Sequence, residues 1–201
     1  MEVRGEAVEI VDEEVEVGGR TLRVLHPRAA DELIDEEAFE REEFLPYWAE
    51  LWPSGVELAR AVAARDVRGL RVVELGCGLA LPSIAAALGG ARVLATDWSE
   101  DALRFARLNA DRNAAQLETL RADWASPDAL VARAPFDLVL AADVLYERRN
   151  ADLLLPLLPR LAPEVLLADP GRPGERPFLE RAAADWRVAT TGRVHRLAAG
   201  G

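Results

Sequence analysis

Residues 71–98 constrain the fold of this chain more than any other stretch. An apolar run leads to Glu74 and then to two glycines, Gly76 and Gly78, before a helical pattern and a second apolar run that ends at Asp97. Glycine at such a turn lets the backbone approach a ligand closely, and an acid after the second strand accepts ribose hydroxyls. Asp97 lies 19 residues after Gly78, close to the ~20 typical of nucleotide-binding α/β sheets.

The residues around the turn favour S-adenosylmethionine (SAM) over a dinucleotide as the cofactor. A dinucleotide site takes the pattern G-x-G-x-x-G, and the third glycine position counted from Gly76 is Leu81. Glu74 would be poorly placed beside a pyrophosphate but well placed near a cation. SAM carries a ribose, an adenine, an ammonium and a sulfonium, and it has no phosphate. A plain tight turn and an NAD site remain the alternatives.

Length and composition narrow the class of protein. The 201 residues fit one domain, and no apolar run reaches the ~20 residues of a membrane-spanning helix. One cysteine excludes an internal disulfide, and two histidines argue against a histidine-based metal site. The net charge is −11, and all 24 basic residues are arginine. We therefore expect a soluble, cytoplasmic and monomeric protein. It is expected to bind neither nucleic acid nor a membrane nor a metal ion.

Strand and helix patterns alternate along the chain. A hairpin around Gly18-Gly19 is predicted within residues 8–25, followed by a charged helix over 30–42 and a helix that begins at Pro53. Ser99 is a predicted helix cap. Further strands are predicted at 70–75, 91–96, 117–121, 136–142, 164–168, 186–190 and 193–198, and helices at 81–88, 99–113, 148–161 and 175–184, with Pro156 and Pro159 expected to break or kink the third.

This order of elements predicts an α/β, Rossmann-like, seven-stranded mixed sheet with helices on both faces. Residues 1–45 are expected to form an extension of hairpin and acidic helix, and residues 46–201 the catalytic unit, within one structural domain overall. The acidic stretch 31–43 is interpreted as a solvated helix face, with a docking surface for a basic protein segment as the alternative.

Acidic and aromatic residues gather where successive predicted strands end. Asp97-Trp98, Asp123-Trp124 and Ala142-Asp143 each follow a strand, as Glu74 does. Ligands of open α/β sheets bind at the carboxyl ends of the strands, so these pairs are expected to surround one ligand. Trp98 and Trp124 would stack on or cover the adenine, and Asp123 would accept its amino group.

Three segments resemble the class I, seven-β-strand SAM-dependent methyltransferases, and more narrowly the "family 16" group that includes many protein-lysine methyltransferases. They are Pro46 to Pro53, Val73 to Gly78, and Asp143 to Tyr146, which matches the D-x-x-Y signature of that group. Residues 169–173 further resemble one branch, the lysine methyltransferases of the electron-transfer flavoprotein β subunit. Ala80 departs from the family, which usually has a third glycine there.

The resemblance implies roles for individual residues. Asp143 and Tyr146 would lie at the substrate entrance and orient the amine, as the catalytic pair. The cofactor site would comprise residues from the turn and from the strand ends: Trp52, Glu74, Gly76, Cys77, Gly78, Asp97, Trp98, Asp123, Trp124 and Ala142. Cys77 is not expected to be a nucleophile, because no histidine lies nearby in the sequence to activate it.

The predicted function is SAM-dependent N-methylation of a protein lysine. Methylation of a small-molecule amine is the nearest alternative within the same fold. A non-catalytic SAM-binding module is disfavoured by the intact Asp143 and Tyr146, and an NAD-dependent oxidoreductase by Leu81 and the acid–tryptophan pairs. A structural role with a partner chain is a further alternative.

Overall fold

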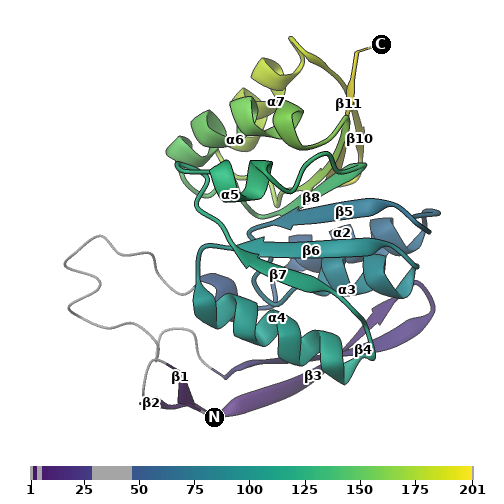
Figure 1. Ribbon diagram of the computed structural model, residues 1–201, viewed down its shortest axis with the longest axis vertical. Helices are drawn as coiled ribbons and strands as arrows, with labels where there is room; N and C mark the ends of the chain where they lie inside the picture. Colours follow the sequence, from purple (N-terminus) through teal and green to yellow (C-terminus); the bar gives the residue numbers. More distant parts are fainter. Residues whose placement is uncertain (1, 4–5, 29–46, 201) are drawn as a thin grey trace.

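The computed structural model describes residues 2–3, 6–28 and 47–200. Its centre is a seven-stranded sheet with the spatial order β10-β11-β9-β8-β5-β6-β7 (Figure 1). Strands β5 to β9 run parallel, and β11 is antiparallel to both of its neighbours. The strand bounds are β5 Arg71–Leu75, β6 Arg92–Asp97, β7 Glu118–Arg121, β8 Leu138–Ala142, β9 Glu164–Ala168, β10 Trp186–Thr191 and β11 Val194–Ala199.

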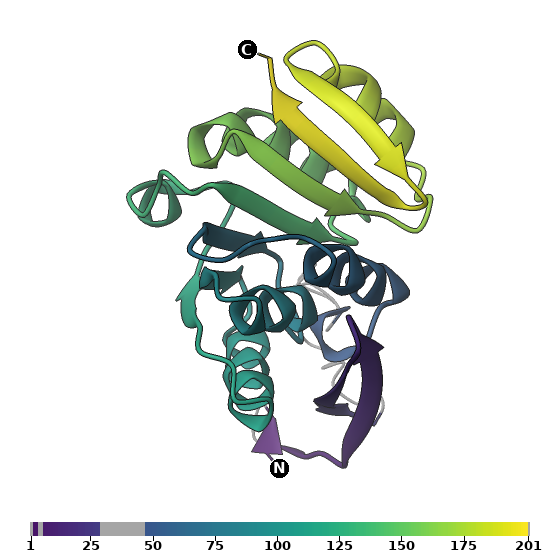
Figure 2. The ribbon, with the colours of Figure 1, turned by 90° about the vertical axis from the view of Figure 1, so that its right-hand side faces the viewer.

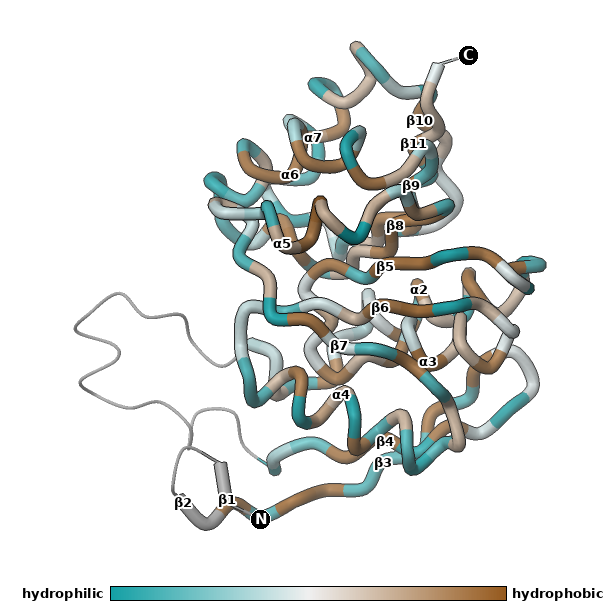
Figure 3. The backbone as a smooth tube through the Cα atoms, in the orientation of Figure 1, coloured by the Kyte–Doolittle hydropathy of each residue, from teal (hydrophilic) through white to brown (hydrophobic). Residues whose placement is uncertain are grey.

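The central strands are apolar because both of their faces are buried. In β5, Val72 belongs to one buried hydrophobic cluster and the next residue, Val73, to another. In β8, Leu138 likewise belongs to the first cluster and Val139 to the second. Parallel strands covered on both faces have nearly continuous hydrophobic runs, and the hydropathy colouring of β5 and β8 shows this (Figure 3). The predicted seven-stranded mixed sheet is therefore confirmed.

Two sets of helices supply the two clusters, as the sequence predicted. Helices α2, α3 and α4 contribute to the first cluster, and α5, α6 and α7 to the second. Their bounds are α2 Pro53–Ala63, α3 Leu81–Leu88, α4 Glu100–Arg112, α5 Asp128–Val131, α6 Arg148–Leu161 and α7 Glu175–Ala182, with a short 3₁₀ helix, η2, at Tyr47–Ala49.

Local signals at the helix ends are confirmed, with one exception. Pro53 opens α2, and the Ser99 hydroxyl accepts a hydrogen bond from the Ala102 amide at the start of α4. Pro156 and Pro159 lie inside α6 without breaking it, so a break there was wrong, and the alternative of a kink stays a prediction. The apolar face of α6 is packed into the second cluster, and this burial outweighs the two backbone hydrogen bonds that the prolines remove.

The N-terminal hairpin joins β3 (Ile10–Val17) to β4 (Arg20–Pro27) through Gly18 and Gly19, both of which have positive φ. This confirms the predicted turn. Strands β1 (Glu2–Val3) and β2 (Glu6–Ala7) form a small pair that the sequence did not predict. The predicted helix at 30–42 and the boundary at 45/46 lie outside the described residues, and the boundary stays a prediction.

The hairpin contributes its apolar residues to the first cluster, beside α2 and α4. Figure 2 shows it at the opposite end of the molecule from the yellow strands β10 and β11. It therefore packs against α2 and α4, which contribute to the same buried cluster.

Candidate functional site

A pocket of about 410 Å³ opens at the carboxyl ends of β5, β6 and β8. Strand β5 pairs with β6 on one side and with β8 on the other, so the strand order reverses here. Open α/β sheets bind their ligands at such switch points. The volume lies within the range of pockets that hold small molecules and cofactors.

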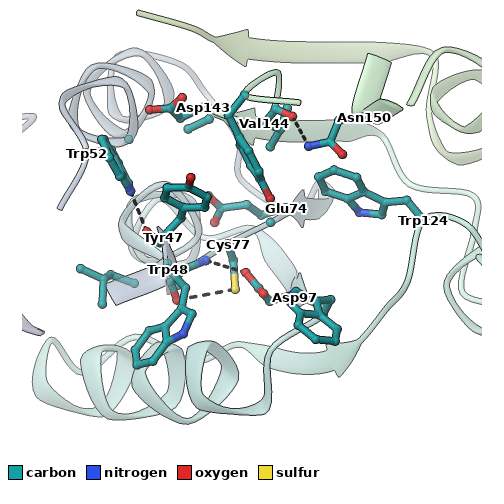
Figure 4. Close-up of a pocket in the computed structure, with 18 of the residues that line it drawn as sticks. Tyr47, Trp48, Trp52, Glu74, Cys77, Asp97, Trp124, Asp143, Val144 and Asn150 are labelled. Carbon is teal, nitrogen blue, oxygen red and sulfur yellow. Dashed lines mark hydrogen bonds between the residues drawn. The ribbon is translucent and has the colours of Figure 1, made fainter. Parts of the chain in front are cut away.

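Every residue predicted for the site lines this pocket. Figure 4 shows Glu74, Cys77 and Asp97 between Trp124 on one side and Tyr47 and Trp52 on the other. The full set is Trp52, Glu74, Gly76, Cys77, Gly78, Asp97, Trp98, Asp123, Trp124, Ala142, Asp143 and Tyr146. The structure thus brings these residues together, and their contacts with a cofactor or substrate stay predictions.

The turn after β5 needs its glycines. Gly76 has a φ of 64°, and a Cβ there would lie 3.3 Å from a Val144 methyl group and 3.4 Å from the Trp124 ring. Gly78 has a φ of 49°, and a Cβ there would lie 3.3 Å from the Trp48 carbonyl oxygen. A side chain at either position would be strained and would displace the pocket wall.

Glu74 is buried beneath the turn, and its carboxyl accepts a hydrogen bond from the Ser83 amide at 3.0 Å. Burial raises the pKa of Glu74 to about 8, against the opposing effect of the Ser83 hydrogen bonds. Ser83 lies in the first turn of α3, where a dinucleotide would place its pyrophosphate. Since Glu74 already engages that amide, a pyrophosphate has no free donor there, and the site fits SAM better than NAD.

Asp97 is fixed at the end of β6 by two backbone amides. One carboxylate oxygen accepts from Gly78 at 3.0 Å and the other from Ser99 at 2.9 Å. Burial raises the pKa of Asp97 despite these bonds. Each oxygen keeps accepting capacity for a further donor, so the carboxylate fits the two hydroxyls of a ribose.

Aromatic residues lie beyond Asp97. The Trp124 ring lies against the Gly76 turn, and Trp98 is 39% exposed beside the Arg121 guanidinium, 5.9 Å from the ring centroid. Asp123 accepts a hydrogen bond from the Ala125 amide at 2.8 Å. Two indoles flanking an acid offer stacking surfaces for a planar base.

Asp143 lies at the other end of the pocket, directly after β8. Its φ of 56° is unusual for a residue with a side chain, although aspartate tolerates it better than most. Arg172 Nε donates to one of its carboxylate oxygens, and the Ser54 hydroxyl donates to the other at 3.4 Å. The hydrogen bond from Arg172 to Asp143 raises the pKa of Arg172. The carboxylate is therefore held in a fixed orientation by two donors.

Tyr146 and two residues of the Pro46–Pro53 segment form an aromatic group beside Asp143. The Tyr47 ring lies 5.1 Å from Tyr146 and 6.4 Å from Trp52, and the Trp52 indole donates to the Tyr47 carbonyl at 2.7 Å. The Arg172 guanidinium lies 5.6 Å from the Trp52 ring centroid. Burial raises the pKa of Tyr146 to about 12, so the phenol stays protonated at neutral pH.

Cys77 is buried within the glycine turn. Burial, together with the charges of Asp97 and Glu74, raises the pKa of its thiol well above the ordinary value. A thiol that is hard to ionise is a poor nucleophile, which agrees with the expectation that Cys77 does not act as one.

Sequence reasoning missed several residues that the structure brings to the site. Tyr47 and Trp48 line the pocket, and Asn150 donates to the Val144 carbonyl at 2.9 Å behind it. Arg172 reaches Asp143 from the loop after β9, which Asp169 shapes by accepting from the Arg172 amide at 2.7 Å. The segments holding Tyr47, Trp48 and Arg172 were singled out in the sequence, but nothing there indicated which side chains meet.

Across residues 2–3, 6–28 and 47–200, no group of three or more His, Cys, Asp and Glu side chains is arranged to hold a metal ion. Within the same ranges, no helix has the length and apolar character needed to cross a membrane.

Comparison with known proteins gives a family. A family model described as "Lysine methyltransferase" matches residues 46–172. The electron transfer flavoprotein beta subunit lysine methyltransferase of Xenopus laevis is 38% identical over 136 residues, covering 63% of this chain and 53% of that protein. The histone-arginine methyltransferase METTL23 of Xenopus laevis is 32% identical over 120 residues, covering 54% and 50%. The chain thus spans about half the length of the curated relatives it matches.

A solved structure extends the likeness over nearly the whole chain. The 16S rRNA N2 G1207 methyltransferase RsmC of T. thermophilus, in complex with AdoMet and guanosine, aligns with a TM-score of 0.65 at 17% identity. The alignment covers 96% of this chain and 51% of that one. At that identity the likeness shows the fold, a Rossmann-like methyltransferase sheet.

Proposed function

This chain belongs to the lysine methyltransferase family, and we propose that it transfers a methyl group from SAM to the side-chain amine of a lysine in a protein substrate. One observation carries the proposal: a single pocket at the sheet's switch point joins a ribose-binding acid, Asp97, to the D-x-x-Y pair, Asp143 and Tyr146. A cofactor bound along the first would present its reactive end toward the second.

Different residues in the cofactor half of the pocket bind different parts of SAM. Asp97 takes the ribose hydroxyls, and Trp98, Asp123 and Trp124 surround the adenine. The turn from Gly76 to Gly78 faces the methionine moiety, and Glu74 lies beneath it. SAM, when bound here, supplies an electrophilic methyl group on a positively charged sulfur.

The acceptor half orients an amine rather than deprotonating it. Asp143 is already engaged by Arg172 and Ser54, and Tyr146 with a pKa of about 12 cannot accept a proton near neutral pH. Asp143, held in place by these two donors, accepts a hydrogen bond from the incoming amine, and the rings of Tyr47 and Trp52 form an apolar wall for the lysine carbon chain. The ammonium loses its proton to water before it reacts. Holding two reactants in line in this way contributes ~7–11 kcal/mol to catalysis.

The chain contains no lysine, which sharpens the test. Purified protein is incubated with methyl-tritiated SAM and lysine-rich proteins, and the labelled amino acids are separated after hydrolysis. The proposal expects labelled Nε-methyllysine, which the enzyme's own residues cannot supply, and its loss in Asp97→Asn. Label in methylarginine, the residue class in the name of the METTL23 relative, or only in a small amine would overturn lysine as the acceptor. SAM binding with no transfer would indicate a non-catalytic module.

We further propose that the protein acts as a cytoplasmic monomer without nucleic acid. The net charge of −11 supports the last point, because phosphate backbones bind to basic surfaces. Light scattering at micromolar concentration tests the monomeric state, and a filter-binding assay with RNA tests the absence of nucleic-acid binding. A dimer mass or retention of RNA would contradict them.

A further inference from the structure

Asn109 of α4 and Asn113, the residue that directly follows the helix, bind the outer edge of β4 in the N-terminal hairpin. Asn109 accepts from the Leu25 amide at 2.7 Å and donates to the Leu25 carbonyl at 3.2 Å. Asn113 accepts from the Arg23 amide at 2.9 Å and donates to the Arg23 carbonyl at 2.8 Å. Four residues of helix rise ~6 Å and two residues of strand ~6.7 Å, so the two spacings match. The asparagines pair with β4 as a neighbouring strand would.

Only one of these two asparagines also reaches the cofactor turn. Asn109 Nδ2 donates a second hydrogen bond, 3.1 Å long, to the carbonyl of Leu79, whereas the further bond of Asn113 goes to the Asn109 carbonyl at 2.8 Å. Asn109 is fully buried, with 0% exposure. Its amide thus links the hairpin at Leu25 to the residue that follows Gly78.

The turn needs such support because of Ala80. This residue, at φ 61° and ψ 29°, adopts the left-handed conformation just before α3. A residue with a Cβ reaches that conformation at a cost of ~1–2 kcal/mol, which glycine would avoid. The Leu79 carbonyl lies in the peptide plane that sets the φ of Ala80. A hydrogen bond that fixes this carbonyl therefore holds the strained residue in place.

We propose that Asn109 is a positioning residue for cofactor binding: by holding the Leu79 carbonyl it keeps the Gly78–Ala80 turn in its binding conformation, and it makes the N-terminal hairpin part of the cofactor site. The inference rests on the proposed SAM site. It assigns to the hairpin a role in binding small molecules, although residues 10–27 lie outside the segment that the family model matches.

Asn113 provides a matched control, since it makes the same pair of bonds to β4 without the bond to the turn. SAM affinity is measured by calorimetry for wild type, Asn109→Ala and Asn113→Ala, well below each variant's unfolding temperature. Asn109→Ala is expected to weaken SAM binding about tenfold, and Asn113→Ala less than twofold. Equal affinities of the two variants for SAM would overturn the inference. If wild type itself does not bind SAM, the proposed function fails first.

The Ala80→Gly variant separates an effect on the turn from a general loss of stability. Glycine removes the strain in the turn, so the turn should depend less on Asn109. In the Ala80→Gly background, Asn109→Ala is therefore expected to weaken SAM binding about threefold or less rather than tenfold. An undiminished tenfold loss would show that Asn109 does not act through the turn.

A measurement on the wild-type protein covers the case in which Asn109→Ala does not fold. The side-chain amides of Asn109 and Asn113 are followed by NMR during titration with SAM. If the turn and Asn109 are coupled, binding at the turn must affect Asn109. We expect the Asn109 amide signals to shift and their hydrogen exchange to slow, and those of Asn113 to stay unchanged. The same response at both residues, or none at Asn109, would overturn the inference.

Discussion

Replacing Glu74 by glutamine should remove a large pH dependence of stability. Burial raises the pKa of Glu74 from 4.5 to about 8 in the folded protein. Folding therefore favours the protonated acid, and its contribution is fully present below pH 4.5 and lost as the pH rises through 8. At 1.36 kcal/mol per pH unit, the difference amounts to ~5 kcal/mol. Within that window the free energy of unfolding should fall by up to ~1.4 kcal/mol per pH unit.

Urea unfolding at half-unit steps from pH 4.5 to 8.5 measures this slope for wild type and Glu74→Gln. Glutamine keeps an oxygen that accepts from the Ser83 amide, but it does not titrate. The free energy of unfolding of wild type minus that of Glu74→Gln should therefore decline from pH 4.5 to 8 and level off above pH 8. The charge of Asp97 adds to the raised pKa of Glu74, so Asp97→Asn should move the upper end of the window to lower pH.

Parallel curves for wild type and Glu74→Gln would refute this reasoning, because they would mean that Glu74 titrates normally when buried. A difference that grows with pH would refute it more strongly, since it would require a stabilising ionised carboxylate under the turn.

Three further predictions concern the turn and the acceptor half. Gly76→Ala should cost ~1–2 kcal/mol in backbone strain. It should also weaken SAM binding, because its Cβ would lie 3.3 and 3.4 Å from side chains of the pocket wall. The control is Gly192→Ala, at φ 60° with nothing within 4 Å, which should lose similar stability while the affinity for SAM stays unchanged. Calorimetry that found equal affinities would contradict this. Arg172→Gln should cost ~1–3 kcal/mol in urea unfolding, and adding Asp143→Asn should restore most of it; strictly additive effects would show that the pair does not interact. Tyr146→Phe should leave the shape of the pH–rate profile unchanged below pH 9, because the phenol has a pKa of about 12; a lost inflection near neutral pH would identify Tyr146 as a base.

The order of elements was predictable because it follows from local patterns. Buried parallel strands require runs such as the one before Glu74, and a turn with several left-handed residues requires glycines such as Gly76 and Gly78. The carboxyl ends of parallel strands all lie at one edge of the sheet, so acids that follow these strands come together there however the helices are packed. The site residues could therefore be brought together without knowing the packing.

Contacts between distant segments could not be predicted in the same way. Arg172 and Asp143 are 29 residues apart on loops after neighbouring strands, and neither residue alone indicates that they pair. Asn109 reads as a polar residue in an amphipathic helix, and its bonds to Leu25 and Leu79 depend on how the hairpin docks. Pro156 and Pro159 do not break α6, because burial of its apolar face outweighs the local preference of proline.

The most direct test is a thermal-shift experiment with SAM, its demethylated product and NAD in parallel. A ligand at ~100 times its Kd adds about 2.7 kcal/mol, which raises the unfolding temperature by ~2–4 °C for a domain of this size. We expect that rise with SAM and with its product, and none with NAD. A rise with NAD and none with SAM would contradict the interpretation of Glu74, Asp97 and the whole pocket.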